Sequence, residues 1–298
     1  LDGWKPASVG VANLREVALH AADAEVVSHA WDAGFTDIAD GLPDGCIGEI
    51  CEKGTKHHPL TDEQKDALFM LTEEMMLTGV DSIMNTGMFL KALDLIDSIQ
   101  VNWKSFTGRE PSPRMYISKG NILMHLEEWG ELVKTTEECL SIHKADITDR
   151  IAAILYSMQG SAYRNLKEYQ KAIRSYEEGA YYYTQIEDSG SQGDMLCSMA
   201  KCYMELGKYT MASSFYEKGF NKFLEYFGTT RSALLRSNFY VNDSYKKTVL
   251  GVFAAHLFSM AVYEQDYGSK YDSKDYLLMS AHCGNPSARS EYQRIYGR

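Results

Sequence analysis

Residues 160–176 read GSAYRNLKEYQKAIRSY, and 40 residues later the segment 200–216 reads AKCYMELGKYTMASSFY. The two segments share a small residue, two tyrosines, a leucine and an alanine at equal offsets: Gly160 and Ala200, Tyr163 and Tyr203, Leu166 and Leu206, Tyr169 and Tyr209, Ala172 and Ala212. Apolar residues recur at three and four residues, which is typical of helices. Small residues allow two helices to approach closely, so each segment predicts an antiparallel helical hairpin.

The same spacing extends towards the N-terminus. An earlier copy contains Gly120, Leu123, Leu126, Trp129 and Leu132, and a weaker one contains Val80, Ile83, Thr86, Phe89 and Ala92. No proline occurs between Arg114 and Asn285, and this absence permits uninterrupted helices. Gly207 suits a left-handed residue after a helix end, and Gly228 is also expected to end a helix. A single hairpin cannot bury its own apolar face, so the copies are expected to stack.

The two quoted segments resemble tetratricopeptide repeats, and with the weaker copies the resemblance covers about residues 72–227. The usual period of that family is about 34 residues. The longer period here predicts longer helices or linkers, and the Gly/Ser-rich stretch 188–193 favours a linker. Long-period repeats of this kind resemble those of Rap-type and PlcR-type peptide-sensing regulators. Residues 273–288 resemble the second half of a Sel1-like repeat.

The predicted fold is therefore all-α, a right-handed superhelical solenoid of antiparallel helical hairpins. We expect an N-terminal helical and loop region at 1–60, tetratricopeptide-like repeats at 61–227, and C-terminal helices with a Sel1-like capping hairpin at 228–298. Asn242, Asp243 and Ser244 predict an N-cap for a helix near 245–265.

Composition restricts the partners. Lysine and arginine number 30 against 41 acidic residues, a net charge of −11, which disfavours nucleic acid and favours a basic or neutral peptide. No apolar run reaches the roughly 18 residues of a membrane span. Six scattered cysteines are typical of reduced thiols, so we expect a cytoplasmic protein.

The resemblance also implies a binding face. In tetratricopeptide arrays, positions one, four and five after the small residue line the inner surface. These positions hold Asp81, Asn121, Ser161 and Lys201, then Met124, Arg164 and Met204 (with Met84 in the weakest copy), then Asn85, His125, Asn165 and Glu205. Amides suit the backbone of an extended peptide, and methionine supplies adaptable apolar contact. The alternative is an ordinary solvated concave face. The Lys/Asn/Lys/Arg clamp of chaperone-binding members is absent.

Catalytic and metal-binding patterns are weak. Cys46, Cys51, His57 and His58 match no common zinc spacing, and adjacent histidines rarely bind one ion. The sequence has no Gly-rich phosphate loop, nucleophile elbow or H-E-x-x-H motif. We therefore expect no enzyme, cofactor or metal, and predict a scaffold that binds protein or peptide on its concave face. The alternative function is a Rap-like or PlcR-like sensor whose solenoid changes shape when peptide binds.

Overall fold

The computed structural model describes residues 62–268 and 270–297, and all regular structure in these ranges is helical. The chain divides into two compact units at Glu128 and Trp129. The predicted N-terminal region at 1–60, with its cysteine and histidine cluster, lies outside the described residues.

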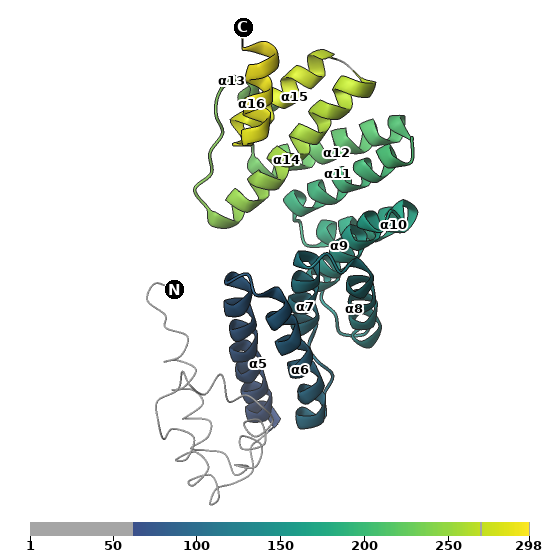
Figure 1. Cartoon of the computed structure of the whole chain (residues 1–298), viewed down its shortest axis with the longest axis vertical. Helices are drawn as coiled ribbons and strands as arrows, with labels where there is room; N and C mark the ends of the chain where they lie inside the picture. Colours follow the sequence, from purple (N-terminus) through teal and green to yellow (C-terminus); the bar gives the residue numbers. More distant parts are fainter. Residues whose placement is uncertain (1–61, 269, 298) are drawn as a thin grey trace, which may run out of the picture. The chain divides into compact units, whose positions relative to one another are not determined.

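The described part of the first unit has three helices: α5 (Asp62–Asn85), α6 (Phe89–Thr107) and α7 (Pro113–His125) (Figure 1). Each of the three packs on the other two. Their shared core consists of Met76, Leu77, Val80, Ala92, Ile96, Ile99, Trp103, Met115 and Ile122. Arg114 at the start of α7 pairs with Glu74 of α5 at 2.7 Å, so polar contacts also join these two helices.

The second unit continues the series of helices. They are α8 (Trp129–Ile142), α9 (Asp149–Asn165), α10 (Tyr169–Gln185), α11 (Ser189–Glu205), α12 (Tyr209–Phe227), α13 (Arg231–Arg236), α14 (Ser244–Tyr267), α15 (Lys270–His282) and α16 (Pro286–Tyr296). The pairs α9 with α10, α11 with α12, and α14 with α15 are hairpins, and α10 packs on α11 (Figure 1). The all-α prediction and the stacking of hairpins are therefore confirmed within this unit.

The repeat of 40 residues is visible in the backbone. The first helices of successive hairpins end at Asn85, His125, Asn165 and Glu205, and the second helices begin at Phe89, Trp129, Tyr169 and Tyr209. Each turn between them has one residue with positive φ: Gly87 (79°), Glu127 (58°), Lys167 (61°) and Gly207 (68°). The left-handed residue predicted at Gly207 is confirmed. The hairpins are thus tetratricopeptide-like, with the same turn conformation at every copy.

A second backbone feature is shared by the last three of these turns. The amides of Glu128, Glu168 and Lys208 donate to the carbonyl oxygens of Leu123, Tyr163 and Tyr203 at 3.0, 2.8 and 2.9 Å. This six-residue bond satisfies a carbonyl that the helix end would otherwise leave unpaired. The aligned Leu and Tyr residues therefore recur at the helix end that each turn closes.

The linker expected at 188–193 is wrong. Helix α11 begins at Ser189, and the Asp188 carboxylate caps it by accepting from the backbone amide of Ser191 at 3.0 Å. Helices α9, α10 and α11 each have 17 residues, so longer helices account for the period between residues 160 and 200. The two glycines of this stretch are buried instead: a methyl group at Gly190 would lie 2.9 Å from the Tyr226 ring.

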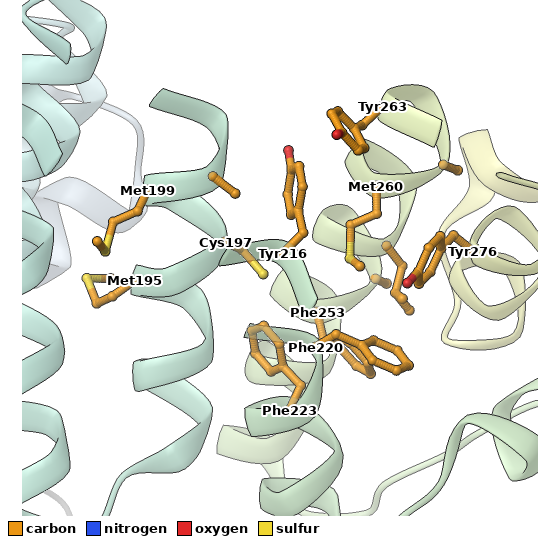
Figure 2. Close-up of a cluster of buried hydrophobic side chains, with 14 of the residues drawn as sticks. Met195, Cys197, Met199, Tyr216, Phe220, Phe223, Phe253, Met260, Tyr263 and Tyr276 are labelled. Carbon is orange, nitrogen blue, oxygen red and sulfur yellow. The ribbon is translucent and has the colours of Figure 1, made fainter. Parts of the chain in front are cut away.

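Helices α11 and α12 approach each other closely. A methyl group at Gly219 would lie 2.5 Å from Cys197 Sγ and 2.9 Å from the carbonyl oxygen of Gly193. Figure 2 shows Cys197 on the side of α11 that faces α12, with Met195 on the opposite side. Glycine is required at this crossing because any side chain would push the helices apart.

Aromatic rings extend the core to α14. The rings of Phe223 and Phe253 stack with centroids 4.7 Å apart, and the ring of Phe220 contacts both Phe253 and Tyr276 of α15 (Figure 2). The position of α14 therefore depends on α12.

The predicted helix boundaries in the C-terminal part are confirmed. Gly228 ends α12 with φ of 59°, and the Asp243 carboxylate caps α14 by accepting from the amide of Lys246 at 2.7 Å. Helix α16 packs on α15 and is capped by the side chain of Asn285. None of the described helices is long and apolar enough to cross a membrane.

The substitution Gly219→Ala is expected to lower the free energy of unfolding by about 2 kcal/mol, because the added methyl group overlaps Cys197. Urea denaturation followed by circular dichroism measures the change. Gly251→Ala is the matched control on α14, where a methyl group meets no atom within 4 Å, and it should stabilise by about 0.5 kcal/mol. An unchanged midpoint for Gly219→Ala would contradict the close crossing.

The left-handed turns predict that two substitutions change the stability of the chain in opposite directions. Lys167→Gly should stabilise the chain by about 1 kcal/mol, since glycine adopts positive φ without steric cost. Gly207→Ala should destabilise it by a similar amount for the same reason. Thermal unfolding of both variants tests the repeat, and shifts in the same direction would show that the two turns differ.

Candidate binding site

Five predicted groove residues belong to the first unit. Asp81 and Asn85 lie on α5, and Asn121, Met124 and His125 lie on α7. All are exposed except Met124, which is partly buried. The His125 ring stacks on Phe89 with centroids 4.5 Å apart, so one face of this imidazole is already covered.

The other six predicted residues belong to the second unit. Ser161, Arg164 and Asn165 lie on α9, and Lys201, Met204 and Glu205 lie on α11. The Asn165 amide donates to the carbonyl oxygen of Ser161 at 2.8 Å, and the Ser161 hydroxyl lies 3.3 Å from that of Tyr176. Both polar side chains therefore have partners within the chain.

Four of these six residues line one open pocket of about 500 Å³, a volume within the range of ligand sites. Its walls come from α9, α11 and α14, with one residue each from α10 and α12. The lining residues are Arg164, Tyr169, Lys201, Met204, Glu205, Tyr216, Phe258, Ser259 and Val262. We call this the Arg164–Lys201 pocket.

Two contacts set the arrangement of its neutral and acidic side chains. The Tyr169 hydroxyl donates to Glu205 Oε2 at 3.3 Å, and the Tyr216 hydroxyl donates to Met204 Sδ at 3.4 Å. Glu205 and Met204 are therefore held by aromatic residues of the second helices. Neither contact uses a cation.

The two cations of the pocket have no ion-pair partner among residues 62–268 and 270–297. Among the described residues, no carboxylate lies within 4.0 Å of Arg164 or Lys201. Burial lowers the pKa of Lys201, and repulsion from Arg164 lowers it further, against smaller opposing effects of Cys197 and Asp194. The local environment therefore disfavours the ammonium charge while nothing is bound.

A polar pair, of which only His256 is buried, joins two walls of the pocket. His256 of α14 is 3% exposed, and its Nε2 lies 2.7 Å from Asp194 Oδ1 of α11. Burial lowers the pKa of His256 despite the hydrogen bond, and Nε2–H donates to the carboxylate, because an ionised carboxylate only accepts hydrogen bonds. Burial alone would raise the pKa of Asp194, but His256, Lys201 and Arg164 lower it overall. This hydrogen bond ties α11 to α14.

A second pocket gives a useful contrast. It has a volume of about 260 Å³ and contains Arg231, which bonds Asp272 at 3.1 Å and Asp275 at 3.3 Å. Its cation is already neutralised by the chain. The Arg164–Lys201 pocket therefore differs in chemistry as well as in size.

Sequence reasoning missed the α14 wall, formed by Phe258, Ser259 and Val262. The spacing of 40 residues ends after α12, because α13 and the segment 237–243 intervene before α14 begins. Counting forward from Lys201 or Glu205 therefore cannot reach these positions. The N-cap residues Asn242, Asp243 and Ser244 predict a helix here, but only the packing of α14 shows which of its faces is open.

Other chemistry has little support in the described part of the chain. No group of three or more His, Cys, Asp or Glu side chains there could hold a metal ion. The described cysteines are Cys139, Cys197, Cys202 and Cys283; all are free and buried. Burial raises the pKa of Cys139 and Cys283 to about 12, so these two are thiols rather than nucleophilic thiolates at neutral pH.

A family model described as "SNAP: Soluble NSF attachment protein, SNAP" matches residues 124–231, less than half of the chain. A solved structure titled "Crystal structure of MamA protein" is 18% identical, with a TM-score of 0.42, and the match covers 66% of this chain and 92% of that one. No curated protein matches. The chain is thus similar to the SNAP family across α8–α12, the helices that carry Arg164 and Lys201.

Proposed function

We propose that the chain is a binding scaffold that holds a protein or an extended peptide on its first-helix face. The observation that carries this proposal is the convergence of Arg164, Lys201, Met204 and Glu205 in one open pocket. These residues share the positions that line the inner face of tetratricopeptide arrays. The pocket combines apolar walls with a few polar groups, which is the usual composition of a recognition site.

The same proposal includes the class of partner, the cellular compartment and the role of the last hairpin. A net charge of −11 disfavours nucleic acid and anionic membranes as direct partners, and the buried free thiols are compatible with the cytoplasm. The hairpin of α15 and α16 fits a capping role at the end of the stack, as a Sel1-like repeat would.

The alternative is a peptide-sensing regulator whose solenoid changes shape on binding. That function assigns the output role to residues 1–60, which lie outside the described range. Small-angle scattering with and without a bound peptide separates the two. An unchanged profile agrees with a scaffold, and a changed radius of gyration favours the sensor.

The scaffold proposal is tested with peptides selected from a random library on the purified chain. In the double variant Met204→Ala/Val262→Gln, we expect the Kd of the selected peptides to rise at least about tenfold, because apolar contact is lost. Met211→Gln is the matched control, since Met211 is 43% exposed against 42% for Val262 and does not line the pocket. Equal affinity for all three proteins would place the site elsewhere.

A binding site of this kind should carry a cost in stability. The folded-state pKa of Lys201 lies below its ordinary value, so its charge opposes folding at neutral pH, and this cost declines as the pH rises through the folded-state pKa. Lys201→Met should therefore raise the free energy of unfolding by about 1 kcal/mol at neutral pH, with a smaller gain at alkaline pH. Urea titrations at two pH values measure both effects. A less stable variant at neutral pH would contradict this account.

A further inference from the structure

The Arg164–Lys201 pocket has two positive charges for which the described residues supply no counter-ion. Lys201 is partly buried and lines the same pocket as Arg164, whose positive charge lowers the pKa of Lys201 further than burial alone does. An anion between them would relieve this repulsion and form charge-assisted hydrogen bonds to both groups. Within the described part of the chain, the pocket therefore holds two positive charges that no carboxylate neutralises.

The nearby carboxylates do not fill this role. Glu205 lines the pocket but accepts from Tyr169, and Asp194 bonds His256 at 2.7 Å on the α14 side. Neither carboxylate comes within 4.0 Å of a pocket cation. Both carboxylates add negative charge around the pocket and would repel any part of a bound anion that lies away from the cations. A single carboxylate therefore fits this pocket better than a run of acidic residues.

Apolar surface adjoins the cations. Phe258 and Val262 of α14 line the pocket, and Val262 is 42% exposed. The rings of Tyr209 and Tyr267 stack with centroids 4.1 Å apart, and Tyr267 is 52% exposed. Tyr209 lies four residues after Glu205, and Tyr267 lies five residues after Val262 on α14, so this aromatic pair lies near the pocket. An apolar side chain next to the carboxylate of a bound segment would thus be able to pack on this surface.

We propose that the Arg164–Lys201 pocket binds the side-chain carboxylate of an internal Asp or Glu in a partner's extended segment, with a large apolar residue beside it on Val262 and the Tyr209–Tyr267 pair. This proposal rests on the scaffold function and specifies the chemistry of its partner. The net charge of −11 requires the rest of the segment to be neutral or basic, since further acidic residues would be repelled.

The test uses three pools of short peptides, each measured by fluorescence anisotropy with the full chain. The first has a central Leu-Glu-Leu, uncharged random flanks and capped ends. The second replaces Glu with Gln, and the third keeps Gln but has a free C-terminal carboxylate. We expect the Glu pool to bind about tenfold more tightly than the Gln pool, with the difference shrinking as salt is added.

Variants assign the effect to the two cations. Arg164→Gln and Lys201→Gln should each abolish the preference for Glu. The matched controls Arg174→Gln and Lys208→Gln, at exposed positions outside the pocket, should leave the preference unchanged. Thermal unfolding checks that all four variants fold, and the comparison of pools on the unmodified chain needs no variant.

Four results would overturn the inference: equal binding of the Glu and Gln pools, a preference that survives both pocket substitutions, tighter binding of the free C-terminal carboxylate than of Glu, or no binding of any pool. The scaffold proposal is decided separately, by library-selected peptides and the Met204→Ala/Val262→Gln variant. Loss of the Glu preference together with retained sensitivity to that variant would reject the carboxylate and leave the scaffold standing.

Discussion

The close crossing of α11 and α12 is the constraint on which the second unit depends. Gly193, Cys197 and Gly219 leave no room for an added methyl group between the two helices. From this crossing the core continues through Phe223 to Phe253, which fixes α14. Helices α11 and α14 are two walls of the Arg164–Lys201 pocket, so this core also supports the pocket.

The turns contribute a second, local constraint. One left-handed residue follows the end of each first helix, and it is either glycine or, as at Lys167, a side chain that adopts the conformation at some cost. A six-residue hydrogen bond also closes α7, α9 and α11. Packing of the hairpins must compensate for that cost. The repeat is thus specified jointly by turn geometry and by the small residues of the helices.

Much of the fold could be predicted from the sequence, because the 40-residue repetition directly encodes helix ends, as at Asn165 and Glu205. The segment 188–193 could not, since its glycines look like a linker until Tyr226 and Phe223 are placed against them. Local composition cannot distinguish a glycine that bends a loop from one that admits an aromatic ring of another helix.

The candidate site was predictable only in part, for a related reason. Positions on α9 and α11 follow from the family's inner face, and four of them meet in the pocket. The α14 wall lies beyond an insertion that breaks the spacing. Whether a cation has a counter-ion also depends on the folded structure. The sequence alone therefore does not distinguish Lys201 from an ordinary surface lysine.

The central claim is that a partner segment occupies the Arg164–Lys201 pocket. Methionine methyl NMR tests it most directly, because Met204 lines the pocket whereas Met211 lies outside it and Met115 is in the other unit. On titration with the tightest peptide from the Glu pool, the account predicts a saturable shift of the Met204 methyl signal with little change at Met211 and Met115. A saturating peptide that moves the signals of other methionines and leaves Met204 unchanged would contradict it.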